Sequence, residues 1–158
     1  MKRAVIYYSL TGNTMKTAEL VAERCGADLI RIDMVKPMPE GFKKQIMYGG
    51  MLATFGKKPE ITGIPDNITA YDDIILGTPV WASTFAPALR TLFTKKDIGD
   101  KVSAVFTLSG SGDNTKCLKK LSKFCPNIKN SVSLSDENNG KPQDNKGLLE
   151  DFIKKISY

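Results

Sequence analysis

Short apolar runs alternate with segments of helical hydrophobic spacing along nearly the whole chain of 158 residues. This alternation constrains the fold strongly, because it is typical of an α/β domain in which helices connect parallel strands. Five runs have strand character: 3–8, 28–33, 73–78, 102–108 and 131–134. We therefore predict a single α/β domain over residues 1–158, which is an ordinary length for one hydrophobic core.

The composition of these runs predicts their order in the sheet. Central strands of a parallel sheet are covered on both faces and read as continuous apolar runs, whereas edge strands tolerate polar residues. The first, third and fourth runs are continuously apolar, and the second and fifth alternate with polar residues. We predict a three-layer α/β/α sandwich with a five-stranded parallel sheet of order 2-1-3-4-5, whose ligand cleft opens where strands 1 and 3 end.

Helices are expected wherever apolar residues recur three or four positions apart. This spacing occurs around residues 15–25, 85–96, 114–124 and 148–156. Segment 34–71 is the hardest to interpret, because it is long for one connection and contains four prolines.

We expect a further helix in the middle of segment 34–71. Its apolar residues Phe42, Ile46 and Met47 are predicted to face inward. Glycine is a poor helix former, so Gly49-Gly50 should weaken or end this helix.

The chain has no histidine, and its cysteines Cys25, Cys117 and Cys125 show no CxxC spacing. The absence of histidine excludes imidazole acid–base catalysis, histidine-activated nucleophiles and histidine-ligated metals. An odd number of cysteines in this pattern is typical of reduced thiols packed in a core. We predict neither a metal site nor catalytic residues, so any redox chemistry would come from a bound cofactor.

The formal net charge of +6 favours anionic ligands or acidic partners. Lysine pairs are scattered along the chain and interleaved with acidic residues, and no nucleic-acid-binding module accompanies them. The sequence also lacks both an apolar run long enough for a membrane span and a signal-type cleavage site after residues 1–8. We therefore expect a cytoplasmic protein that binds no nucleic acid.

A first candidate binding loop leaves the first predicted strand and enters the first helix. A helix start offers unpaired N–H groups and a positive dipole end, and nearby hydroxyls add donors, so a phosphate could bind here without a lysine. The alternative is that Thr11 or Asn13 only caps the helix. The loop is neither a Walker A nor a GxGxxG sequence. Its residues are Ser9, Leu10, Thr11, Gly12, Asn13 and Thr14.

Two further loops follow the third and fourth predicted strands at the same edge of the sheet. The loop after the third strand contains the only tryptophan of the chain, which could stack on a planar ring or simply seal the sheet edge. The loop after the fourth strand is rich in glycine, which allows close approach to a flat ligand but is also common before helices. The candidate residues are Thr78, Pro79, Val80, Trp81, Ala82, Ser109, Gly110, Ser111, Gly112 and Asp113.

The first loop resembles the FMN phosphate loop of flavodoxins. The segment Gly77-Thr78-Pro79-Val80-Trp81, with Pro87 and Leu92-Phe93, resembles a short-chain flavodoxin-like branch. This resemblance covers nearly the whole chain. It implies that residues 9–14 bind the FMN phosphate, that residues 78–82 line one side of the isoalloxazine ring, and that residues 109–113 contact its pyrimidine edge.

The sequence departs from the flavodoxin pattern in two respects. Many flavodoxins carry a tyrosine after the third loop that stacks on the outer flavin face, whereas residues 114–117 contain no aromatic side chain. Flavodoxins are also usually acidic, whereas this chain is basic. The outer flavin face is therefore expected to be open, and redox partners are expected to present acidic surfaces.

The resemblance implies an FMN-binding electron carrier that passes electrons between redox partners. An alternative is an FMN-dependent oxidoreductase that uses NAD(P)H and a quinone or another small acceptor. A third possibility is a regulatory or assembly module that retains the fold without the flavin. The sequence leaves both a monomer and a homodimer open.

Overall fold

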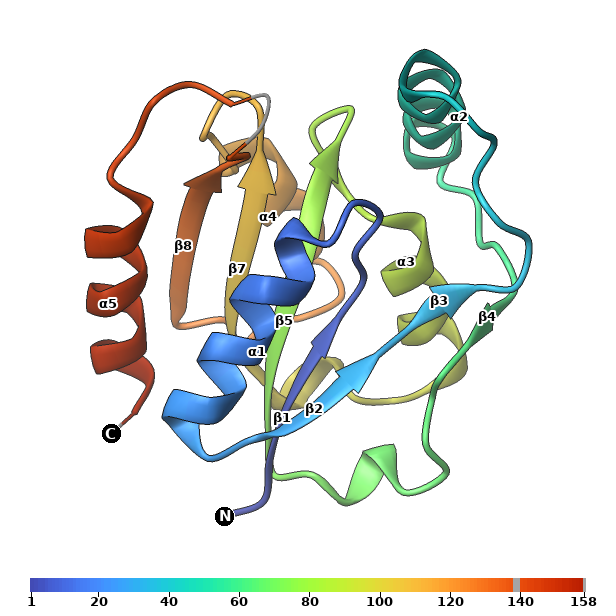
Figure 1. The fold of residues 1–158 in the computed structure, drawn as a ribbon. Coiled ribbons are helices and arrows are strands. Elements are labelled where there is room, and N and C mark those ends of the chain that lie inside the picture. Colours follow the sequence, from blue (N-terminus) through green and yellow to red (C-terminus); the bar gives the residue numbers. More distant parts are fainter. Residues whose placement is uncertain (138–139, 158) are drawn as a thin grey trace.

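The computed structural model describes residues 1–137 and 140–157, and Figure 1 shows its fold. Five parallel strands form the body of one sheet, in the order β2-β1-β5-β7-β8. These strands are β1 (Arg3–Tyr7), β2 (Asp28–Arg31), β5 (Asp73–Trp81), β7 (Val102–Ser109) and β8 (Asn130–Ser135). The predicted α/β fold with a parallel sheet is confirmed, and the continuously apolar strands are the central ones.

The predicted count of five strands is wrong, because three short strands are present as well. Strand β6 (Thr84–Phe85) adds to the main sheet as an antiparallel neighbour of β5, and β3 (Asp33–Met34) pairs antiparallel with β4 (Ile61–Thr62). Strands of two residues are too short for an apolar run or an alternation to show in the sequence. Strand β5 also continues beyond its predicted end at residue 78, because its pairing with β6 extends it to Trp81.

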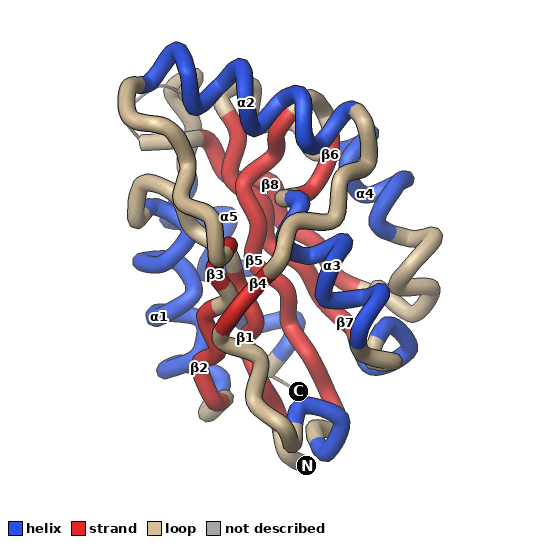
Figure 2. Tube along the Cα trace, turned by 90° about the vertical axis from the view of Figure 1, so that its right-hand side faces the viewer, coloured by secondary structure: helices blue, strands red, loops and turns tan. Residues whose placement is uncertain are grey.

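Helices cover both faces of the sheet. In Figures 1 and 2, α1 (Asn13–Cys25) and α5 (Asn145–Ile156) lie on one face, whereas α3 (Pro87–Lys95) and α4 (Thr115–Leu121) lie on the other. Two separate clusters of buried apolar side chains fill the spaces between these layers. Helix α3 begins two residues later than expected, because Phe85 belongs to β6 and Pro87 occupies the first helical turn.

Helix α2 (Phe42–Thr54) confirms the helix expected in the middle of segment 34–71, but its end and its orientation differ from the expectation. The helix runs through Gly49 and Gly50 instead of ending there. Phe42, Ile46 and Met47 do not face inward, since they are 57%, 59% and 75% exposed. Figure 2 shows that α2 lies across the edge where the parallel strands end, and its buried residues are only Gly49, Leu52 and Ala53.

The three cysteines are free thiols. Cys117 and Cys125 are buried as expected, and burial raises the pKa of each to about 12. Cys25 is only partly buried, at the last turn of α1. Among the described residues, no helix has the length and apolar character needed to cross a membrane.

Candidate functional site

The loop between β1 and α1 is held from within by the Ser9 hydroxyl. Ser9 is buried, and its Oγ accepts hydrogen bonds from the backbone N–H groups of Gly12 at 3.1 Å and Met15 at 3.2 Å. Gly12 has a φ of 95°, a conformation that glycine adopts easily, and it turns the chain into the helix. The N-cap residue of this helix is Gly12, which has no side chain, so neither Thr11 nor Asn13 acts as the simple cap considered above.

The same turn leaves backbone donors available. Within residues 1–137 and 140–157, the N–H groups of Thr11, Asn13 and Thr14 have no hydrogen-bond partner. Unpaired N–H groups at a helix start, together with the positive end of the helix dipole, bind phosphate and other anions. The local structure therefore has the donors that the sequence predicted for this loop.

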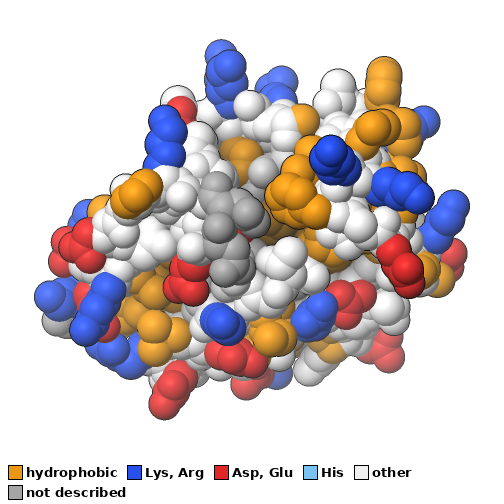
Figure 3. Space-filling view, turned by 45° about the horizontal axis from the view of Figure 1, so that its top comes forward, with side chains coloured by type: hydrophobic (Ala, Val, Ile, Leu, Met, Phe, Trp, Pro, Cys, Tyr) orange, Lys and Arg blue, Asp and Glu red, His pale blue; other side chains and the backbone are white. Residues whose placement is uncertain are grey.

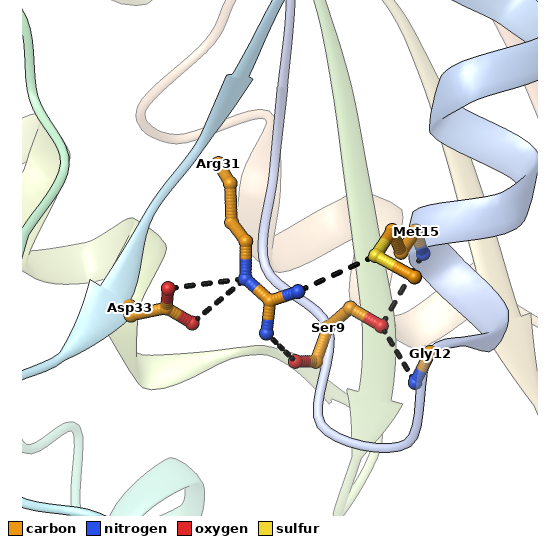
Figure 4. Close-up of polar contacts among 5 residues, drawn as sticks. All are labelled: Ser9, Gly12, Met15, Arg31 and Asp33. Atoms are coloured by element: carbon orange, nitrogen blue, oxygen red, sulfur yellow. Dashed lines mark hydrogen bonds and ion pairs between the residues drawn. The ribbon is translucent and has the colours of Figure 1, made fainter.

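Arg31 supports the loop from the outside, as Figure 4 shows. Its guanidinium donates a hydrogen bond to the Ser9 carbonyl at 3.1 Å and contacts the Met15 sulfur at 3.5 Å. Asp33 holds the guanidinium through its Nε, 3.0 Å from both carboxylate oxygens, and this pairing raises the pKa of Arg31. The sequence pattern did not identify Arg31 as a site residue, because its contact with the loop depends on the parallel pairing of β1 with β2.

The second predicted segment is a β-hairpin. The two residues at its tip, Ala82 and Ser83, have φ values of 49° and 58°, as a tight type I′ connection requires. Thr78 is fully buried and anchors the hairpin, because its Oγ1 accepts a hydrogen bond from the Ala86 N–H at 2.9 Å. The hairpin thereby fixes where the Trp81 side chain lies.

Trp81 is held between two neighbours. Tyr8 packs against the indole edge to face, with ring centroids 5.5 Å apart and planes at 88°. A Cβ atom at Gly49 of α2 would lie only 3.0 Å from Trp81 Cε3, so the helix can approach the indole this closely only because residue 49 is glycine. Burial raises the pKa of Tyr8 to about 12, so its phenol stays neutral in this packing.

The third predicted loop contributes an unpaired hydroxyl. Ser109 Oγ is the one buried side-chain polar atom without a hydrogen-bond partner among the described residues. Such a group is costly unless a ligand or water satisfies it. Farther along the loop, Asp113 accepts hydrogen bonds from the Thr115 N–H and hydroxyl, which lowers the pKa of Asp113.

The three loops enclose one cavity of about 380 Å³ at the edge where the parallel strands end. Figure 3 looks toward this edge. Ten of the sixteen predicted site residues line the cavity: Leu10, Thr11, Asn13, Thr14, Pro79, Val80, Trp81, Ala82, Ser109 and Gly110.

The other six predicted residues lie around the cavity rather than in its wall. Ser9 and Gly12 shape the first loop, and Thr78 anchors the hairpin. Ser111 and Asp113 line a smaller neighbouring pocket of about 250 Å³, which shares Ser109 with the main cavity. Gly112 has a φ of 68° and shapes the turn between Ser111 and Asp113.

Six residues of the cavity wall were missed by sequence reasoning. Four come from α2, which forms a complete side of the cavity, and two come from the ends of β7 and β8. Asp136, directly after β8, accepts a hydrogen bond from the Asn13 side chain at 3.1 Å. This bond connects the start of α1 to the end of the edge strand β8. The missed residues are Phe42, Gln45, Ile46, Gly50, Leu108 and Asp136.

Comparison with known proteins agrees with this architecture. A family model described as flavodoxin matches residues 2–141 of the chain. The chain belongs to the flavodoxin family. The match extends from β1 to the loop after β8, and so includes all three loops of the cavity.

Solved structures similar to this member of the flavodoxin family include three bacterial proteins. A candidate flavoprotein from Bacteroides eggerthii is 23% identical with a TM-score of 0.76, covering 99% of this chain and 98% of its own. One from Bacteroides uniformis is 22% identical with a TM-score of 0.73, covering 97% of both chains. A Lactobacillus acidophilus flavoprotein in complex with FMN is 23% identical with a TM-score of 0.67, covering 85% of this chain and 91% of its own.

Proposed function

We propose that this chain binds FMN in the 380 Å³ cavity and transfers electrons through it. One observation carries the proposal: a helix start with unpaired N–H groups, a tryptophan and an unpaired buried hydroxyl all border the same cavity. A phosphate, a flat aromatic ring and a polar ring edge are the three parts of FMN that such groups suit. The similar fold of a flavoprotein that binds FMN supports the proposal.

Each part of the cavity has a distinct role in this proposal. The N–H groups of Thr11, Asn13 and Thr14 would bind the phosphate, and the hydroxyls of Thr11 and Thr14 would add donors. Trp81, fixed by Tyr8 and Gly49, would lie against the ring, and Ser109 Oγ would hydrogen-bond its polar edge. FMN supplies the one- or two-electron chemistry, and the protein residues orient it and shield it from water.

The direct test is a titration of the flavin-free protein with FMN and, in parallel, with riboflavin, which lacks the phosphate. The quenching of Trp81 fluorescence reports binding of either ligand close to the indole. If the first loop binds phosphate, FMN binds at least about tenfold more tightly than riboflavin, because several charge-assisted hydrogen bonds are lost with the phosphate. Equal affinities would contradict the role of the loop, and a protein that takes up no FMN would point to the flavin-free module.

A second candidate function is an FMN-dependent oxidoreductase of a quinone or another small acceptor. It is favoured by the α2 side of the cavity, where Phe42 and Ile46 line the wall and remain more than half exposed. Such an apolar wall could hold a flat acceptor. Steady-state oxidation of NADPH in the presence of a quinone would support this function, whereas a loaded protein that does not react with NAD(P)H would support the carrier.

The carrier is the function we favour, and it requires a protein partner. The basic charge of the chain, +6, favours partners with acidic surfaces. Association with such partners should weaken as the ionic strength rises.

A further inference from the structure

Exposed apolar side chains gather on α2 and its C-terminal end. Five of the ten large hydrophobic residues that are exposed in the described chain lie within residues 42–55. We call these five the α2 patch: Phe42, Ile46, Met47, Met51 and Phe55, with exposed fractions of 57%, 59%, 75%, 44% and 71%. Figure 3 shows apolar side chains gathered over this side of the molecule, with lysine and arginine side chains around them. A concentration of this kind on one helix is typical of an interaction surface.

The α2 patch is bordered by positive charge. Lys43 and Lys44 lie on the helix, Lys57 and Lys58 follow Phe55, and all four are exposed. None of these lysines forms a salt bridge with another described residue. The only acidic residues in segment 36–60 are two glutamates against five lysines. A partner that covers the patch must therefore supply negative charge around an apolar centre.

We propose that the α2 patch is the docking surface for an acidic protein that exchanges electrons with the cofactor. The proposal rests on the proposed function, because Phe42 and Ile46 belong both to the patch and to the wall of the cavity. A partner seated on the patch would contact the mouth of the cavity directly. Methionine side chains, which are flexible and polarizable, suit a surface that binds and releases a transient partner.

A second copy of this chain fits the patch less well. A two-fold interface would place the patch against itself. Because exposed lysines border the patch at both ends, lysines of one copy would then approach lysines of the other copy, and like charges brought together oppose association. The two glutamates of the segment are too few to neutralise them.

A lipid surface also fits less well, because charged and apolar side chains are intermixed around α2. At 3.6 residues per turn, Lys43 projects between Ile46 and Met47 on the helix circumference. Helices that lie on membranes separate an apolar face from a charged one. Intermixed apolar and positive side chains suit a protein surface that carries both apolar groups and carboxylates.

The test measures electron transfer from the reduced, FMN-loaded protein to two ferric haem proteins, acidic cytochrome b5 and basic cytochrome c. In each reaction one electron leaves the reduced protein and converts ferric haem to ferrous haem. Stopped-flow mixing gives the second-order rate constant for the unmodified chain, for the double variant Lys43→Glu/Lys44→Glu, and for the matched control Lys154→Glu/Lys155→Glu. The control residues are exposed on α5, away from α2, and change the net charge equally.

We expect the Lys43→Glu/Lys44→Glu variant to react with cytochrome b5 at least about tenfold more slowly at low ionic strength, and the α5 control less than about twofold more slowly. With cytochrome c the α2 variant should react faster than the unmodified chain. At high salt the differences should largely disappear. Equal effects of the two double variants would overturn the proposal, because net charge rather than the α2 patch would then govern association.

Further measurements separate this proposal from its rivals and from FMN binding. The visible spectrum shows whether the protein has taken up FMN. If it has not, docking is tested by adding cytochrome b5 to the ¹⁵N-labelled protein, and the proposal then requires NMR chemical-shift changes in residues 42–58. A dimer in analytical ultracentrifugation that dissociates in Met47→Gln/Met51→Gln would assign the patch to a second copy and overturn the proposal. Co-sedimentation with phosphatidylserine vesicles that requires Lys43 and Lys44 would overturn it as well.

Discussion

The first loop and α2 both line one cavity, but they are built in different ways. Residues 9–14 are held by several defined hydrogen bonds, from the Ser9 hydroxyl within the loop and from Arg31 outside it. Helix α2 is held mainly by close packing of Gly49, Leu52 and Ala53, and its apolar outer side chains remain exposed. A rigid loop suits the binding of a resident cofactor, whereas an exposed apolar helix suits a visiting partner.

The largest effect is expected from Ser9→Ala in the first loop. The change removes the acceptor for the Gly12 and Met15 N–H groups, and these groups help to set the shape of the loop. Two hydrogen bonds of about 1 kcal/mol each correspond to a loss of FMN affinity of roughly 10- to 30-fold. A fluorescence titration measures this loss. The control is Ser122→Ala on the exposed end of α4, whose hydroxyl bonds only the Lys119 carbonyl and should leave FMN affinity unchanged.

The second-largest loss of FMN affinity is expected when the contact of Arg31 with the same loop is removed. In Arg31→Met the Ser9 carbonyl loses its donor and the loop loses a nearby positive charge, so FMN affinity should fall about tenfold. Arg24→Met is the matched control, because Arg24 pairs with Glu150 on the exposed surface between α1 and α5. An Arg31→Met protein with unchanged affinity would show that Ser9 alone suffices to hold the loop.

The packing of α2 can be tested with two neighbouring glycines. Gly50→Ala should stabilise the protein by up to about 1 kcal/mol, because alanine favours a helix and nothing lies within 4 Å of the added methyl group. Gly49→Ala should stabilise the protein less than this, or destabilise it, because its methyl group would lie 3.0 Å from Trp81 Cε3 and 3.3 Å from Met38 Cε. Urea unfolding curves measure both. Equal stabilisation by the two substitutions would mean that α2 is not packed tightly on Trp81.

The last effect appears only at alkaline pH and concerns the point where the two regions meet. Tyr8 follows β1 and packs on Trp81, and burial raises its pKa from 10.0 to about 12. Because the folded protein favours the neutral phenol, this contribution to stability is complete below pH 10 and is lost as the pH rises from 10 to about 12. Unfolding free energies measured over this range should fall more steeply for the unmodified protein than for Tyr8→Phe. Parallel curves would contradict the raised pKa.

The sequence by itself determined the parallel α/β fold and the location of the three loops, because both follow from local patterns. Apolar runs identify β1, β5 and β7 as central strands, and parallel strands end at a common edge of the sheet. Ten of the loop residues chosen on that basis do line one cavity. That they hold FMN stays a prediction.

Only the tertiary structure decided the placement of α2, the role of Arg31 and the hairpin that carries Trp81. The spacing of Phe42, Ile46 and Met47 predicts a helix with an apolar face, but it cannot say that the helix crosses the edge of the sheet and leaves that face exposed. Arg31 reaches the first loop because β2 pairs with β1, which brings together residues more than twenty positions apart. The physical reason is common to these cases: contacts between distant segments depend on how whole elements pack, and a local pattern does not contain that information.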